Sequence, residues 1–240
     1  METSGDRRII GRLRTGEFVG RESEMARIRN FSAGGERRPR LAMLRGPTRV
    51  GKTEILRRSF DQLFDQSGDV VPVYYALKPD CLNAQAFARN FLATFLAQLI
   101  AFRQNDPGLL SLANEPLASI ARASGAEDYV WVKGVADAVL QFADGSDGAA
   151  VVRCALSAPT LAARETGFLP LVMFDDVHLL AAERAGEAAA RATAELRDAF
   201  FTSLIIEPAS GAMPRYVLCG FERPMTELLP PDQALFNSLD

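Results

Sequence analysis

The chain has 240 residues, 48% of them hydrophobic and 24% charged, which is enough apolar material to bury a large core and excludes general disorder. Its 27 basic and 30 acidic residues nearly cancel, to a net charge of -3, so no global field favours a polyanion and nucleic-acid binding would have to be local. The uncharged stretches fall far short of the roughly 18–20 apolar residues that a membrane-spanning helix requires, so we predict no membrane partner.

The first 17 residues predict an irregular, basic leader with neither the apolar region nor the cleavage site of a secretory signal. We interpret its arginines as a flexible arm or solvated face rather than a phosphate-binding patch, because the chain as a whole is acidic. The cysteines lie far apart and form no CxxC pair: Cys81, Cys154 and Cys219. We therefore predict reduced thiols and a cytoplasmic location.

After the leader, predicted helices and strands alternate. A short helix through Ile28 is followed by a strand at 41–44, a glycine turn and a helix with regular apolar spacing. A second strand is predicted at 70–77, where Pro72 favours a sheet edge or the start of a strand. The next helix, at 83–103, carries an apolar stripe at every fourth position that we assign to the core: Phe87, Phe91, Phe95 and Leu99.

The alternation continues in the second half of the chain. A third buried strand is predicted at 169–174, a charged helix at about 182–204 and a fourth strand at 216–219. Between the second and third strands, residues 105–167 predict an alanine-rich helical insertion packed beside the sheet. Its expected breaks are Pro107, Pro116, residues 145–148 and Pro159.

The strongest chemical signal is a full match to GxxxxGK[ST] between the first strand and the helix that follows it. The matching residues are Gly46, Pro47, Thr48, Arg49, Val50, Gly51, Lys52 and Thr53. Backbone N–H groups of such a loop wrap around phosphate oxygens, and glycine at both ends permits the curvature. Lys52 can reach the β- and γ-phosphates, while the Thr53 hydroxyl can ligate Mg²⁺. We therefore predict a nucleotide phosphate site here.

A pair of carboxylates, Asp175 and Asp176, directly follows the third strand. Buried parallel strands of nucleotide-binding sheets deliver functional groups at their carboxyl ends. Asp175 fits a Walker B aspartate that holds Mg²⁺ through water. Asp176 fits the acid that orients or deprotonates the attacking water, although it is shorter than the more usual glutamate. The predicted catalytic residues are thus Lys52, Asp175 and Asp176, and the predicted metal ligands are Thr53 and Asp175.

Together these motifs resemble the ATPase domain of the AAA+/STAND branch of P-loop proteins, including archaeal-type ATPases. Residues 18–24 resemble the FVGRE-x-E opening motif of that branch, and residues 46–54 resemble its GPRRVGKTE-like loop, with Thr48 where arginine is frequent. The resemblance spans about residues 18–236. It implies a three-layer P-loop ATPase core over 18–240 that binds ATP or ADP with Mg²⁺. It also implies base-side contacts, near the adenine and ribose, from Val19, Gly20 and Arg21, and a further nucleotide contact from Glu54 at the end of the loop.

The chain departs from that family after the third strand. The fourth strand offers Cys219, a poor hydrogen-bonding group, where the family has a polar sensor, and Glu222 or Arg223 are the substitutes at hand. We expect no room for the family's fifth strand, helical lid and second sensor, and hence either a piece of a longer protein or a reduced ATPase. For Arg223 we favour a surface position over an arginine finger.

Two further features suggest chemistry but favour packing. His178 is the sole histidine and follows the carboxylate pair, yet the cysteines do not complete a zinc set, so we interpret it as a helix-entry residue. Trp131 and Tyr129 could stack on a base, but basic residues do not surround them, so we assign them to packing.

Three functions remain open. The Asp175–Asp176 pair, which resembles that of STAND switches, favours a slowly hydrolysing, nucleotide-gated oligomerisation switch in a signalling or defence protein, acting through self-association or a partner protein. The arginine-rich leader would suit a DNA-linked ATPase of the transposition or replication-loader type, which the acidic composition does not favour. Cys219 and Asp176 would also suit a nucleotide-binding adaptor that does not hydrolyse ATP.

Overall fold

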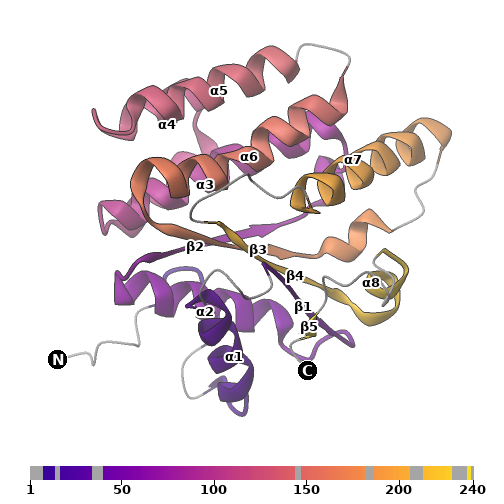
Figure 1. Ribbon diagram of the computed structural model, residues 1–240. Helices are drawn as coiled ribbons and strands as arrows, with labels where there is room; N and C mark the ends of the chain where they lie inside the picture. Colours follow the sequence, from indigo (N-terminus) through magenta and orange to yellow (C-terminus); the bar gives the residue numbers. More distant parts are fainter. Residues whose placement is uncertain are drawn as a thin grey trace.

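The computed structural model describes residues 8–13, 17–33, 40–143, 147–181, 186–205, 213–228 and 237–238. Within them, five parallel strands form one sheet in the order β2-β3-β4-β1-β5 (Figure 1). The strands are β1 (Leu41–Gly46), β2 (Val70–Ala76), β3 (Leu169–Asp175), β4 (Arg215–Phe221) and β5 (Asn237–Ser238). The four predicted strands are confirmed. The chain is an α/β protein with a parallel sheet.

The fifth strand corrects an expectation. We expected no room for one after β4, yet β5 pairs with β1, with Asn237 opposite Ala42 and Ser238 opposite Met43. A strand of two residues needs no apolar run of its own, because backbone pairing with the neighbouring strand holds it in the sheet. The hydrophobic pattern of the sequence therefore could not reveal it.

Helices cover both faces of the sheet (Figure 1). One face is covered by α1 (Glu22–Ser32) and α2 (Lys52–Gln66), and the other by α3 (Ala84–Arg103), α6 (Gly148–Thr166) and α7 (Glu187–Ile205). An outer layer on that second face holds α4 (Leu117–Ala123) and α5 (Tyr129–Ala143), and α8 (Glu222–Leu228) follows β4. Short 3-10 helices are η2 (Pro79–Cys81), η3 (Pro107–Asn114) and η4 (Val177–Leu180).

The region expected to be a helical insertion, 105–167, is helical and divides into two parts. Its first part is η3, α4 and α5, while α6 packs on α3 and α7 and leads directly into β3. The expected break at Pro159 is wrong, because this buried proline lies inside α6. Packing of α6 against its neighbours offsets the roughly 3 kcal/mol cost of proline in a helix interior. The start of the helix expected at 182–204 falls partly outside the described residues, since 182–185 are not among them.

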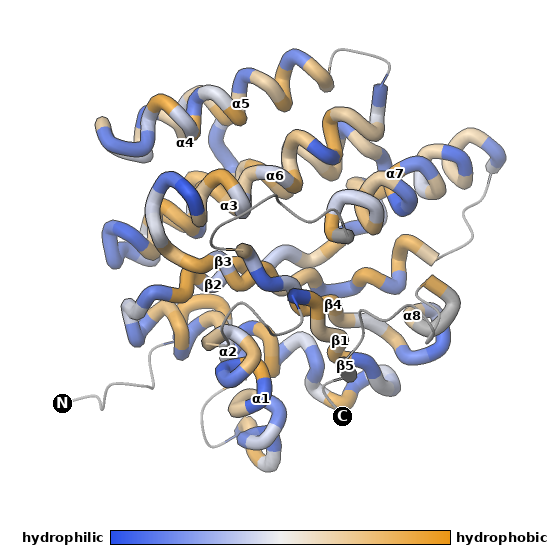
Figure 2. The backbone as a smooth tube through the Cα atoms, in the orientation of Figure 1, coloured by the Kyte–Doolittle hydropathy of each residue, from blue (hydrophilic) through white to orange (hydrophobic). Residues whose placement is uncertain are grey.

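One hydrophobic core covers both faces of the sheet, with buried residues of α3 and α6 on one face and of α1 and α2 on the other. Hydrophobic residues are frequent in the strands and in the helices beside them (Figure 2). The predicted stripe of α3 is buried there, and the Phe91 ring lies 5.3 Å from that of Phe174 and 5.5 Å from that of Tyr75. Aromatic pairs at such separations add to the free energy gained by burial. This confirms the core assignment of the stripe. No described helix is long and apolar enough to cross a membrane.

A side chain of α3 binds the outward-facing backbone groups of the edge strand β2. Gln98, which is buried, accepts a hydrogen bond from the Tyr74 N–H at 2.7 Å and donates one to the Tyr74 carbonyl at 2.9 Å. One amide side chain thus satisfies both backbone groups of a strand residue. The edge position that Pro72 predicted is confirmed.

Candidate functional site

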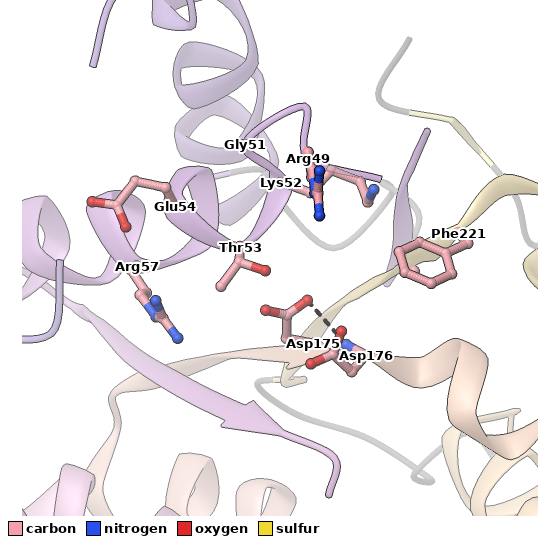
Figure 3. A pocket seen from close by; sticks show the side chains of 10 residues that line it. Arg49, Gly51, Lys52, Thr53, Glu54, Arg57, Asp175, Asp176 and Phe221 are labelled. Carbon is pink, nitrogen blue, oxygen red and sulfur yellow. Dashed lines mark hydrogen bonds between the residues drawn. The ribbon is translucent and has the colours of Figure 1, made fainter. Parts of the chain in front are cut away.

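The predicted chemical residues converge at the carboxyl edge of the sheet. The loop formed by residues 46–53 joins β1 to α2, Asp175 ends β3, and Phe221 ends β4, which lies between those two strands. They surround a cavity of about 290 Å³ (Figure 3). Its lining includes Arg49, Lys52, Thr53, Arg57, Asp175 and Asp176. We call this the first cavity.

The 46–53 loop turns through two left-handed positions, Arg49 with φ 64° and Gly51 with φ 87°. Successive N–H groups in such a turn form a concave surface suited to an anion, and Gly51 leads directly into α2. Gly46 does not have positive φ, and a Cβ there would meet nothing closer than 3.7 Å. The conformational demand therefore falls on positions 49 and 51 rather than on both ends of the motif.

Lys52 is buried at the mouth of the loop. Its Nζ donates hydrogen bonds to the carbonyl oxygens of Gly46 at 2.9 Å and Pro47 at 2.5 Å. It also lies 5.2 Å from the centre of the Phe221 ring. Exchanging neutral carbonyls for anionic phosphate oxygens would make both partners of each hydrogen bond charged, which adds ionic attraction to bonds that now have a charged donor only. Lys52 can therefore hold an anion in the first cavity.

Asp175 is buried and held in place. The Tyr74 hydroxyl donates to its Oδ2 at 3.0 Å, and the Asp176 N–H donates to its Oδ1 at 2.9 Å. Figure 3 shows the Thr53 hydroxyl directed towards this carboxylate. A hydroxyl and a carboxylate are the hard oxygen donors that Mg²⁺ prefers, usually together with substrate phosphates. The predicted metal ligands thus lie together, although the described residues form no cluster of three His, Cys, Asp or Glu that could hold a metal alone.

Asp176 adopts an unusual backbone conformation. Its φ is 58° and its ψ 29°, in the left-handed region, and its half-buried side chain lines the first cavity. Burial, reinforced by the charge of Asp175, raises the pKa of Asp176, while Arg57 and Lys52 act in the opposite direction. A carboxylate with a raised pKa is a stronger base than an exposed one, which suits the role predicted for Asp176.

The neighbouring groups on β4 and η4 are uncharged at neutral pH. Burial, together with the charge of Asp175, raises the pKa of the Cys219 thiol well above its usual value. Burial also lowers the pKa of His178, whose ring lies 3.8 Å from that of Phe221. His178 therefore packs beside the first cavity, and Asp176 Oδ1 lies 3.9 Å from its Nδ1. These positions support the packing role predicted for the histidine.

Three residues of this site were not predicted from the sequence: Tyr74, Arg57 and Phe221. Arg57 follows Thr53 by four positions on α2, so the two share a helix face, and its guanidinium lies 5.5 Å from the Tyr74 ring. The helical spacing could have identified Arg57. Tyr74 could be found only from the pairing of β2 with β3, which places Tyr74 opposite Met173, near the carboxyl end of β3.

The opening motif adjoins the 46–53 loop. Arg21 donates to the Val50 carbonyl at 2.9 Å and pairs with Glu24 at 2.6 Å. A second cavity, of about 230 Å³, lies on this side and shares Lys52 with the first. Arg21 lines it, whereas Gly20 and the 76% exposed Val19 do not. The structure thus brings one of the three predicted base-side residues to a cavity.

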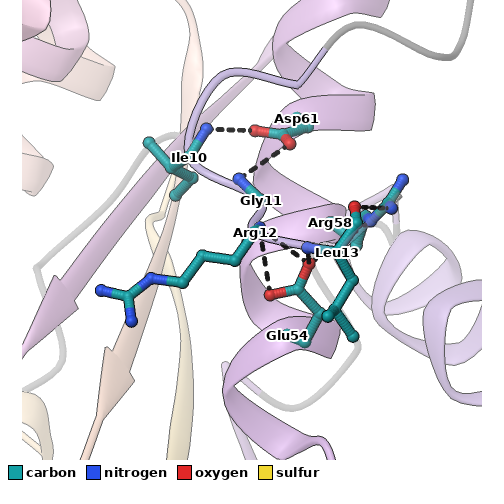
Figure 4. Close-up of polar contacts among 7 residues, drawn as sticks. All are labelled: Ile10, Gly11, Arg12, Leu13, Glu54, Arg58 and Asp61. Carbon is teal, nitrogen blue, oxygen red and sulfur yellow. Dashed lines mark hydrogen bonds and ion pairs between the residues drawn. The ribbon is translucent and has the colours of Figure 1, made fainter. Parts of the chain in front are cut away.

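Glu54 and the other predicted residues lie as follows. Glu54 lines the first cavity, but its carboxylate is turned away from Lys52 and Asp175 and binds the backbone of the leader (Figures 3 and 4). Trp131 is partly buried against the core and donates to Asp128 at 3.0 Å, as its packing role predicts. The same assignment is wrong for Tyr129, which is 37% exposed because it lies on the solvent side of α5. Arg223 is exposed on α8 and does not line the first cavity.

Comparison with known proteins adds no family assignment. No family model matches the chain, and neither a curated protein nor a solved structure matches it. The similarity to P-loop ATPases therefore depends on the three short motifs and on how the fold brings two of them, residues 46–53 and Asp175–Asp176, around one cavity.

Proposed function

We propose that this protein binds ATP with Mg²⁺ and hydrolyses it slowly, as the nucleotide-gated switch of a signalling or defence protein. One observation carries the proposal: Lys52, Thr53 and both carboxylates of the Asp175–Asp176 pair, which lie more than 100 residues apart in sequence, line the same cavity at the carboxyl edge of a parallel sheet. A turn with a surface lysine would not need carboxylates from another strand beside it.

The roles follow from the chemistry of each group. The loop N–H groups and Lys52 would hold the β- and γ-phosphates, while Thr53 and Asp175 would hold Mg²⁺, which neutralises phosphate charge when bound. Asp176, with its raised pKa, would orient and deprotonate the attacking water. Tyr74 fixes the Asp175 carboxylate through its hydroxyl. Arg57 adds positive charge on the side of the cavity opposite β4.

A second candidate, a nucleotide-binding adaptor without hydrolysis, is favoured by one observation on β4. Cys219 is buried and its thiol is neutral, and the next lining residues are Gly220 and Phe221, which bring no hydrogen-bonding side chain to the cavity. A transition state in phosphoryl transfer needs positioned donors around the developing charge. Phosphate release from Mg-ATP measured on the purified protein separates the two candidates.

The lysine of the loop provides the direct test of ATP binding. Lys52→Ala should weaken binding of a fluorescent ATP analogue at least 100-fold, because the phosphates lose their charged partner in a buried position. The matched control is Lys133→Ala, which removes an exposed lysine on α5 that pairs with Asp137. Undiminished binding by Lys52→Ala, with Lys133→Ala also unchanged, would remove the ATP assignment.

A further inference from the structure

Helix α2 buries three charged side chains on one face. Glu54, Arg58 and Asp61 are 7%, 8% and 4% exposed, and they follow one another at spacings of four and three residues. Charged residues are rarely buried to this extent without partners. Within the helix, Arg58 Nε lies 3.5 Å from Glu54 Oε1. The remaining partners come from a distant part of the sequence.

Those partners are backbone groups of the leader (Figure 4). The N–H groups of Ile10 and Gly11 donate to the two oxygens of Asp61, at 2.8 and 3.0 Å. The N–H groups of Arg12 and Leu13 donate to Glu54 Oε1, each at 2.9 Å. Arg58 in turn donates to the Leu13 carbonyl. Four consecutive N–H groups and one carbonyl are thus bound by side chains of a single helix, which we call the strap contact.

Gly11 fits the strap contact closely. A Cβ at this position would lie 2.6 Å from Asp61 Oδ2, well inside van der Waals distance. Because the other interactions are with the backbone, the strap contact depends on the path of the backbone at residues 10–13 and on the absence of a side chain at position 11. Of the two interpretations of the leader, the flexible arm is wrong for residues 10–13, because their backbone is bound to α2. The solvated face agrees with the exposed positions of Arg8 and Arg12.

The strap contact adjoins the first cavity through Glu54. This residue follows Thr53 directly and lines the cavity, while its carboxylate is bound on the leader side. Without the leader, a buried negative charge in the first turn of α2 would lose two N–H donors. Arg58 alone would then hold the carboxylate. With fewer partners it could turn towards the place where phosphate oxygens would lie, and like charges at such distances repel.

We propose that residues 10–13 are a strap whose docking on α2 favours nucleotide binding in the first cavity, because it holds the Glu54 charge away from the phosphates. This inference rests on the proposed function, because its ligand is the nucleotide proposed above. The strap contact itself does not depend on that function. Linkage is reciprocal, so bound nucleotide must strengthen docking by the same factor.

Hydrogen exchange of the leader amides tests the docking without any ligand. In the wild-type protein the amides of residues 10–13 should exchange slowly, and in Gly11→Val they should exchange at rates typical of an open chain. The matched control is Gly134→Val, at an exposed position of α5 where a Cβ meets nothing within 4 Å. Amides of β1, β3 and β4 on the same samples report whether the fold is retained. Fast exchange of residues 10–13 in the wild-type protein would overturn the proposal.

The coupling is tested with the fluorescent Mg-ATP analogue. Gly11→Val should bind it about fivefold or more weakly than wild type and Gly134→Val, a factor within the usual range of coupling between sites. Equal affinity, with the strap amides exposed, would overturn the proposal. If Gly11→Val loses the core protection as well, Arg12→Pro, which removes one donor to Glu54, replaces it.

The reciprocal measurement needs no variant of the strap. Saturating Mg-ATP analogue should slow exchange of residues 10–13 in the wild-type protein and leave it unchanged in Lys52→Ala. Binding without any slowing would contradict the coupling. Slow leader exchange without any nucleotide binding would instead contradict the proposed function and the coupling, and leave the strap contact as a structural feature.

Discussion

The backbone of Asp176 explains why an aspartate and not a glutamate follows Asp175. Its left-handed conformation is one that Asp and Asn adopt far more readily than other non-glycine residues. The short side chain is therefore a consequence of the turn between β3 and η4. Sequence alone suggested only that the acid was shorter than usual.

Substitutions at this position should separate shape from charge. Asp176→Asn should retain the fold and ATP affinity but slow phosphate release at least tenfold, because an amide cannot act as a base. Asp176→Glu keeps the charge but should lower the free energy of unfolding by about 1 kcal/mol, the cost of a left-handed conformation for an ordinary residue. Denaturant unfolding and phosphate release measure the two effects. Equal turnover of Asp176→Asn and wild type would place the base elsewhere.

The pH dependence of stability gives an independent check on the same pair. Because burial raises the pKa of Asp176, the folded protein binds this proton more tightly than the unfolded chain. Its contribution to stability is present below the unfolded pKa, about 4, and is lost as the pH rises through the folded value. Asp176→Asn should therefore gain stability relative to wild type as the pH rises from about 4 through the folded pKa of Asp176. A constant difference across that range would contradict the shift.

At the scale of elements, sequence predicted what depends on local pattern. The four longer strands are buried apolar runs, and the α3 stripe has helical spacing, so both were evident. The motif residues Lys52, Thr53 and Asp175 were equally evident, because each belongs to a short sequence motif with a known chemical role. Tyr74, Arg57 and the strap contact depend on pairing between distant segments, which no local pattern records. The helix break predicted at Pro159 was wrong, because packing of α6 outweighs the low helix propensity of a single proline.

The contact between α3 and β2 allows a prediction about stability. Gln98→Leu removes both hydrogen bonds to Tyr74 and leaves a backbone N–H and carbonyl without their partners. At about 1–3 kcal/mol for each unsatisfied buried group, the free energy of unfolding should fall by about 3 kcal/mol. Urea unfolding measures this change.

The C-cap residue of the same helix provides the control. Gln104→Leu changes an exposed glutamine whose amide donates to the Ala123 carbonyl at 3.2 Å, and we expect its cost to stay below about 1 kcal/mol. A Gln98→Leu variant as stable as Gln104→Leu would mean that water replaces the lost side chain at the strand edge.

For the whole molecule, the strand order determines what surrounds the first cavity. Because β4 lies between β1 and β3, its carboxyl end stands between the loop and the carboxylate pair, and its residues face any ligand held there. That position is filled by Gly220 and Phe221. Gly220 has no space for a side chain, since a Cβ would lie 2.7 Å from Met225 Sδ of α8 and 3.2 Å from the His178 N atom.

We therefore expect slow chemistry from the protein on its own. At concentrations where it is monomeric, turnover of Mg-ATP should stay below about one per second, at the low end of typical enzymes, because β4 adds no donor to the transferring phosphoryl group. Phosphate release with the Lys52→Ala variant as background provides the measurement. Turnover of tens per second would show that the described residues already form a complete catalytic site. The proposal of a slowly hydrolysing switch would then be wrong.

The closed edge of β2 limits how copies of this protein can associate. Residues 69 and 77 bond towards β3, so the even-numbered residues of β2 present their backbone groups outwards. Pro72 has no N–H to offer, and both groups of Tyr74 are taken by Gln98. An incoming strand would find no donor at Pro72 and neither backbone group free at Tyr74, which protects this edge from strand addition. Assemblies that form with the fold intact should therefore not extend the sheet beyond β2, and contacts through the helical faces are the alternative to examine first.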